Sequence, residues 1–248
     1  TERTGRRVQE QGMWLWSYGM EHLPWVRRVL HNGYVMEQLE PVEFDPAETS
    51  PSIRALWSTL TKARKCVGVK SRINAPFVAL DRDALHAYVK TLAADVQVTP
   101  TLNQYLKFIT WPTELCWTHG DPIIDNVMLR RRANGIVQTV LIDPIPPTPA
   151  VPSLAVVDYG RVIQSAAGYE SLRYLGVDLD DWQDHVAKML DNVAITTYER
   201  GFDVNTIRAT LFYAVMHMLR GARTAPDDRK AAIIQRAHDL EGMLLDWL

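Results

Sequence analysis

The sequence has little cysteine and no long apolar run. Its 248 residues include two cysteines, Cys66 and Cys116, which lie far apart and have no CxxC partner. This excludes a disulfide framework and a cysteine-ligated zinc site, and a reduced, cytoplasmic setting is the default expectation. No stretch approaches the roughly 18 apolar residues that a membrane span needs. The opening segment TERTGRRVQEQ lacks the pattern of a signal peptide. We therefore expect no membrane partner.

An excess of charge of either sign is also absent. The formal net charge is −2, so no basic field favours nucleic acid as a partner. Hydrophobic residues make up 47% of the chain and charged residues 23%, the usual balance for a globular protein with a core. The length suits one large domain or two unequal lobes.

Two short hairpins are predicted. The first joins strands Val26–Leu30 and Tyr34–Leu39 through the Asn32-Gly33 pair, which is a strong signal for a two-residue turn. The second joins the apolar runs Val127–Leu129 and Ile136–Ile142 across a charged turn. Both hairpins are antiparallel in pattern.

The rest of the chain has mainly helical periodicity. Asp81 or Asp83 is placed to cap one of these helices. The acidic segment Pro41–Pro51 is read as a linker, and the five prolines at 144–152 predict a rigid loop. Helices are expected over 6–20, 53–65, 82–94, 102–109, 155–167, 180–199, 204–223 and 227–247.

Polar residues interrupt the apolar pattern within 116–129, which reads CWTHGDPIIDNVML. His119, Asp121 and Asn126 lie where an apolar run breaks into a loop, and Asp143 ends the returning run LID. A hairpin would bring Asn126 and Asp143 together. Mg²⁺ prefers one or two protein oxygens together with substrate phosphates. Phosphoryl transfer needs such ligands and a base that orients the hydroxyl nucleophile, so the pattern predicts a centre of that kind.

The order H-G-D, four residues, N, and then a strand ending in I-D resembles the aminoglycoside phosphotransferase and choline kinase superfamily. The resemblance is strongest across 116–170. It implies an α+β, protein-kinase-like fold, with a short mixed N-terminal part and a mainly helical C-terminal lobe. It also implies that Asp121 is the catalytic base, that His119 braces the catalytic loop, and that Asn126 and Asp143 bind Mg²⁺.

Asp158, in VVDYG, competes with Asp143 for the role of main metal ligand. Asp143 lies 22 residues beyond Asp121, close to the separation in that superfamily, whereas Asp158 lies 37 beyond and precedes a predicted helix. Members often carry a second aspartate there, which caps a helix and anchors the catalytic loop. We assign Asp158 to that structural role, and the reverse pairing stays open.

The N-terminal part implies a nucleotide site by the same resemblance. Glu10 stands where the small lobe carries the glutamate that pairs with the ATP-binding lysine. The strand GYVMEQLEP resembles the connection between lobes, so Met36, Glu37, Gln38 and Leu39 would line the adenine site.

The superfamily's glycine-rich loop and phosphate-binding lysine are missing from this part of the sequence. Nine residues precede Glu10, none of them lysine, and the first lysine is Lys62. The small lobe is either lost, absent from this sequence or supplied by another chain. We expect a reduced small lobe over 1–42 and a large lobe over 43–248, with the catalytic hairpin at 116–143.

Two functions are compatible with these residues. The first is an ATP- and Mg²⁺-dependent phosphotransferase acting on a hydroxyl of a small molecule, with nucleotide and acceptor as its partners. The second is a catalytically silent pseudokinase that serves as a binding or structural module, which the missing lysine favours. The string GDPIID at Gly120–Asp125 resembles a motif of metallophosphatases, but the D-x-H and G-N-H motifs of those enzymes are absent.

Overall fold

The computed structural model describes most of the chain, and its contacts divide the chain into two compact units. The first unit comprises 1–77 and 116–147, and the second comprises 78–115 and 148–248. This grouping differs from the expected division after residue 42, because it places the hairpin of 116–143 with the N-terminal residues. The described residues are 2–18, 21–42, 49–68, 80–96, 102–111, 115–145, 152–198 and 204–247.

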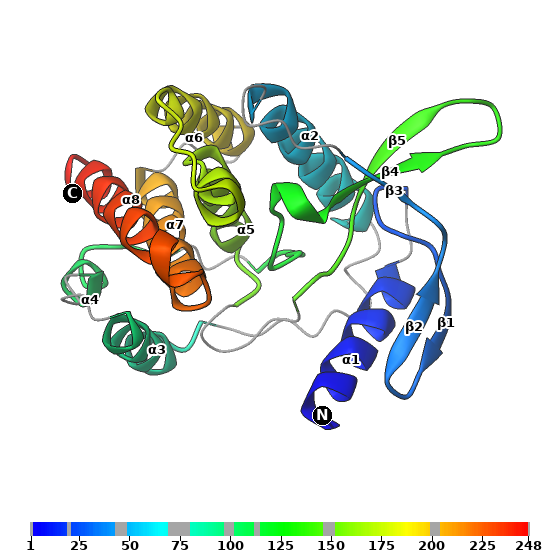
Figure 1. Ribbon diagram of the computed structural model, residues 1–248. Helices are drawn as coiled ribbons and strands as arrows, with labels where there is room; N and C mark the ends of the chain where they lie inside the picture. The colour runs from blue at the N-terminus through cyan, green and yellow to red at the C-terminus, as the bar shows by residue number, and fades with distance from the viewer. Residues whose placement is uncertain are drawn as a thin grey trace. The chain divides into compact units, whose positions relative to one another are not determined.

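The first unit begins with a helix packed on a hairpin. Helix α1 (Glu2–Tyr18) contacts strands β1 (Val26–Leu30) and β2 (Gly33–Met36), as Figure 1 shows in blue. A Cβ on Gly12 would lie 2.8 Å from the Cβ of Tyr34. Such contacts essentially never occur, so glycine at this position is what lets the helix approach β2 so closely.

The turn of this hairpin lies one residue earlier than expected. Leu30 pairs with Gly33, so His31 and Asn32 form the turn and Gly33 belongs to β2. The prediction that Asn32 and Gly33 form the turn was therefore wrong. A type I′ turn needs positive φ at both central residues, and neither Asn32 nor Gly33 adopts one. Strand β2 also ends at Met36, three residues before the expected end.

A second sheet has the strand order β3-β4-β5 and is antiparallel throughout. It contains β3 (Glu40–Pro41), β4 (Val127–Arg131) and β5 (Val137–Leu141). The predicted hairpin of 127–142 is confirmed, with Val127 opposite Leu141. Helix α2 (Thr49–Gly68) packs on β4 and β5. Of the expected linker, 43–48 lies outside the described residues, while β3 and the start of α2 take up its two ends.

The second unit is helical in its described part. Helices α5 (Ala155–Ala166) and α7 (Val204–Arg223) pack closely, and a Cβ on Gly160 of α5 would lie 2.6 Å from the Cβ of Tyr213 on α7. Asp81 caps α3 (Arg82–Asp95), since its Oδ1 accepts from the backbone N–H of Ala84 at 3.0 Å. The elements are α3 (Arg82–Asp95), α4 (Leu102–Tyr105), α5 (Ala155–Ala166), a π-helical turn (Ser171–Leu175), α6 (Trp182–Tyr198), α7 (Val204–Arg223) and α8 (Asp227–Leu245).

The predicted helices agree with these elements to within a few residues, except the helix of 102–109, which ends at Tyr105. Most of the proline-rich loop falls in 146–151, outside the described residues. None of the helices in the described ranges combines the length and apolar character that crossing a membrane requires.

Candidate active site

The β4–β5 hairpin carries Asn126 and Asp143 at one end. Asn126 closes the 3₁₀ turn Ile124–Asn126 and directly precedes β4. Its backbone carbonyl accepts from the N–H of Ile142 at 2.9 Å, which extends the ladder one step beyond the pair of Val127 and Leu141. Asp143 is the next residue. The antiparallel register therefore brings the two polar residues to the same edge.

Asp121 is joined to Asn126 through the side chain of the asparagine. The amide Nδ2 of Asn126 donates to the backbone carbonyl of Asp121 at 2.8 Å and reaches its carboxylate Oδ2 at 3.5 Å. The amide nitrogen is thus turned toward Asp121, which directs the amide oxygen to the other side, where it can act as a ligand. Asn126 is buried, so this orientation is fixed by its surroundings.

The loop that carries Asp121 is held against the segment that follows Asp143. The N–H of Ile145 donates to the carbonyl of His119 at 2.8 Å. Gly120 has φ of +82°, and a Cβ there would lie 2.4 Å from the carbonyl oxygen of Ile145. Only glycine accepts that conformation and that approach without strain. His119 is buried, and its ring lies edge-on to Trp14 and Trp117, 6.3 Å from each centroid, while the two tryptophan rings lie 5.2 Å apart. Its bracing role stays a prediction.

Asp143 has an unusual backbone conformation. Its φ of 53° lies in the left-handed region, which costs a non-glycine residue on the order of 1–2 kcal/mol. The flanking backbone holds it there. The N–H groups of Ile142 and Ile145 donate to the carbonyls of Asn126 and His119, and the carbonyl of Pro144 accepts from Gln11 Nε2 at 3.0 Å. Strained residues of this kind cluster at functional sites.

Tyr34 donates its hydroxyl to Oδ1 of Asp143 at 3.3 Å. Burial, together with the charge of the Asp143 carboxylate, raises the pKa of Tyr34 to about 12. The phenol is therefore protonated at neutral pH and acts as the donor. The bond is long for an O–H···O contact, so it steers the carboxylate rather than locking it.

These side chains share a cavity of about 600 Å³ within the first unit. That volume is in the range of sites for ligands the size of a drug or a nucleotide. Four residues expected at the site line it: Asp121, Asn126, Asp143 and Met36. The complete lining is Arg7, Val8, Gln11, Gly33, Tyr34, Met36, Asp121, Asn126 and Asp143.

The donor set is compatible with Mg²⁺ rather than with a metal that needs a full protein cage. Within the described ranges no three His, Cys, Asp or Glu side chains form a metal-binding group. Two carboxylates and an amide oxygen remain at the cavity, from Asp121, Asp143 and Asn126. Mg²⁺ is usually held by one or two carboxylates and completes its octahedron with waters and substrate phosphates.

The other expected site residues lie outside this lining. Glu10 is exposed on α1, and Gln38 and Leu39 follow β2 without contributing to the cavity wall. Asp158 is fully buried in the first turn of α5, in the second unit. The N-cap of that helix is Leu154, so Asp158 does not cap it as expected.

Sequence reasoning missed Arg7, Gln11 and Tyr34. Arg7 and Gln11 are four residues apart and so share a face of α1, and this spacing was readable from the sequence. Nothing in the sequence indicated that this face, rather than that of Glu10, lines the cavity. Tyr34 lies on β2, next to the segment expected to hold nucleotide.

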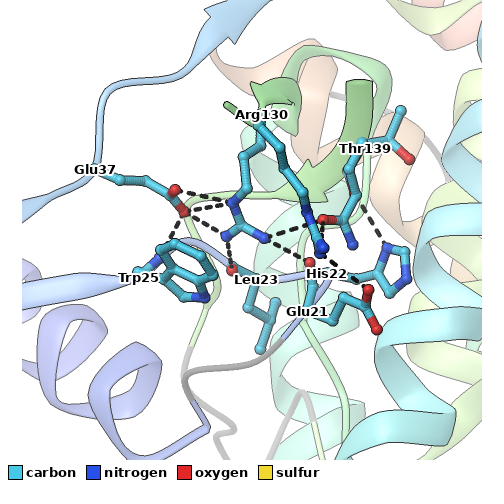
Figure 2. Close-up of polar contacts among 9 residues, drawn as sticks. Glu21, His22, Leu23, Trp25, Glu37, Arg130 and Thr139 are labelled. Atoms are coloured by element: carbon cyan, nitrogen blue, oxygen red, sulfur yellow. Dashed lines mark hydrogen bonds and ion pairs between the residues drawn. The ribbon is translucent and has the colours of Figure 1, made fainter. Parts of the chain in front are cut away.

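A buried ion pair and its neighbouring hydrogen bonds join β4 to the residues on either side of the first hairpin (Figure 2). The guanidinium of Arg130 is 3% exposed, and its Nε donates to both carboxylate oxygens of Glu37 at 2.9 Å. Its Nη1 and Nη2 donate to the carbonyls of Glu21 at 2.7 Å and Leu23 at 2.6 Å. The group also lies 4.4 Å from the ring centroid of Trp25. The carboxylate of Glu37, expected near the nucleotide, is thus engaged by Arg130.

Replacing Glu37 with leucine is expected to lower the free energy of unfolding by about 3–5 kcal/mol, because it leaves the Arg130 charge buried without its partner. Denaturant unfolding measures this change. The matched control is Glu40→Leu, since Glu40 bonds the exposed Arg131 at 3.0 Å and should change stability little. Equal effects of the two substitutions would contradict the assignment of Arg130 and Glu37 as a structural clamp.

Comparison with known proteins finds a distant similarity among solved structures, but none among family models or curated sequences. Among solved structures it is similar to Plasmodium vivax ethanolamine kinase, with 11% sequence identity and a TM-score of 0.47. The match covers 100% of this chain and 74% of that chain. No residue role follows from a similarity of this size. The described part of the chain is rich in helices with a few short antiparallel strands, in agreement with the expected α+β class.

Proposed function

We propose that this chain carries the catalytic centre of an ATP- and Mg²⁺-dependent phosphotransferase whose acceptor is a hydroxyl of a small molecule. The observation that carries the proposal is the convergence of Asp121, Asn126 and Asp143 on one cavity of about 600 Å³. These three residue types supply a base and two oxygen ligands, which are the parts that phosphoryl transfer requires.

Asp143 and Asn126 would hold the cation. The carboxylate of Asp143 is exposed to the cavity and is steered by Tyr34, while the amide oxygen of Asn126 is directed by the bond that its nitrogen makes to Asp121. When bound, Mg²⁺ neutralises charge that develops on the phosphate oxygens. The anchored backbone at Asp143 directs its carboxylate toward the cavity, and preorganisation of this kind reduces the barrier.

Asp121 would orient the acceptor hydroxyl and accept its proton. Its carboxylate lies at the cavity, beside the proposed cation ligand Asn126. A base in that place aligns the hydroxyl oxygen with the phosphorus, and this positioning supplies most of the benefit because the transition state needs little covalent assistance.

A catalytically silent binding or structural module remains the second candidate, and the composition of the cavity favours it in one respect. None of the residues that line the cavity is a lysine. A module of that kind has no use for a base and two ligands at one place, whereas an enzyme needs all three.

Thermal unfolding with ATP, with Mg²⁺ and with both together tests the proposal. We expect Mg²⁺ and ATP together, at millimolar concentration, to raise the Tm by more than the sum of the separate shifts, because a ligand that binds only the folded state stabilises it by mass action. The same samples should form ADP slowly, with water as the acceptor. An unchanged Tm and no ADP would contradict the proposal.

A further inference from the structure

The face of α1 that contacts the Asp143 segment also carries an arginine. Gln11 donates to the carbonyl of Pro144, directly after Asp143, and so fixes this face of the helix beside the candidate site. Arg7 lies one turn earlier on the same face, about 6 Å farther along the axis at 1.5 Å per residue. Both residues line the cavity together with Asp121 and Asp143.

The charges on the cavity wall favour two ligands that bind together. Among its nine lining residues, Asp121 and Asp143 are acidic and Arg7 alone is basic, so the formal charge is −1. A cavity with that charge attracts a cation. With one divalent cation bound, the formal charge becomes +1, and the same cavity then attracts an anion.

We infer that Arg7 binds the phosphate groups of a cation-bound polyphosphate at this site. The inference rests on the proposed function. The guanidinium presents a planar fork of donors that matches two phosphate oxygens, and it is more weakly hydrated than an ammonium group. Arg7 is exposed on the helix, so its side chain can extend into the cavity without crossing the core.

The two places of opposite charge on the cavity wall indicate the class of ligand. One phosphate would meet the cation held at Asp143, while another reaches Arg7, which lies one helical turn along α1 from the Gln11 that bonds Pro144. A nucleoside triphosphate or diphosphate offers a separate phosphate for each place, whereas a monophosphate offers one phosphate for both. Affinity for ATP and ADP in the presence of Mg²⁺ should therefore depend on Arg7, and affinity for AMP should not.

Titration calorimetry of the whole chain tests this, with Mg²⁺–ATP and Mg²⁺–AMP as ligands. Mn²⁺ alone, followed by its electron paramagnetic resonance signal, reports cation binding separately. We expect Arg7→Ala to weaken Mg²⁺–ATP binding by about 10- to 100-fold, the usual effect of losing charge-assisted hydrogen bonds. Mn²⁺ binding should not weaken, because Arg7 is no ligand of the cation. Arg7→Lys should recover part of the affinity, since it restores the charge without the fork.

The matched control is Arg27→Ala, which removes an exposed arginine from β1 that does not line the cavity. It should bind Mg²⁺–ATP like the wild type. The unliganded Tm of each variant shows whether it is folded. If Mn²⁺ binds the wild type but Arg7→Ala binds Mg²⁺–ATP normally, the inference is overturned and the proposed function stands. If the wild type binds neither Mn²⁺ nor Mg²⁺–ATP, the proposed function fails and the inference with it.

Discussion

Replacing Asp143 with asparagine or alanine is expected to remove nearly all phosphoryl transfer and most of the affinity for Mn²⁺. The carboxylate is the proposed main ligand of the cation, and no other side chain on the cavity wall can move into its place. Asp121 is held in the loop before β4, and Asn126 carries no charge, so neither can replace the Asp143 carboxylate. Without the cation, the charge that develops on the phosphate oxygens is not neutralised.

The two substitutions at Asp143 separate the loss of charge from a change in the backbone. Asparagine tolerates the left-handed conformation and can still accept from Tyr34, so Asp143→Asn changes little besides the charge. Alanine adds strain at φ of 53° and should lower the Tm further. Initial rates of ADP formation and Mn²⁺ titration measure the effect of the lost charge, and the Tm measures the effect on the backbone. An Asp143→Asn variant that retained even a tenth of the wild-type rate would contradict the assignment and would reopen the case for Asp158.

The sequence predicted the elements that carry the site because each one has a local signal. The runs Val127–Leu129 and Ile136–Ile142 are apolar and flank a charged turn, so their pairing follows from composition and turn length. Once the hairpin is accepted, antiparallel register places Asn126 beside the end of the returning strand. The long helices of the second unit were equally clear from their apolar period.

The contacts around the candidate site could not be predicted from the sequence, because they join residues that are far apart in the chain. Arg130 sits in a charged RRR run that is indistinguishable from a solvated turn, yet it is buried against Glu37 while its neighbour Arg131 is exposed. The face of α1 that lines the cavity depends on the approach of Gly12 to Tyr34, and a glycine in a helix is only a weak signal. The turn at His31-Asn32 shows the reverse case, in which cross-strand pairing overrides a strong local preference.

Replacing Asp121 with asparagine is expected to slow transfer by about 10²–10⁴-fold and to leave nucleotide binding nearly unchanged. A positioned base acts mainly in the transition state, so its loss should lower kcat and kcat/KM together while KM for ATP stays constant. Asparagine keeps the backbone carbonyl that Asn126 uses, and therefore the shape of the loop. Single-turnover rates with a saturating acceptor, and calorimetry with Mg²⁺–ATP, measure the two quantities separately.

Asp125→Asn is the matched control for Asp121, because Asp125 belongs to the same loop but is exposed and does not line the cavity. It should transfer at close to the wild-type rate. A parallel fall in both variants would indicate that the loop had been disturbed rather than the base removed. A loss of Mg²⁺–ATP affinity in Asp121→Asn as large as its loss of rate would assign Asp121 to the cation instead. Neither substitution should alter anything measurable if the chain is a silent module, so a selective effect at Asp121 is the result that separates the two functions.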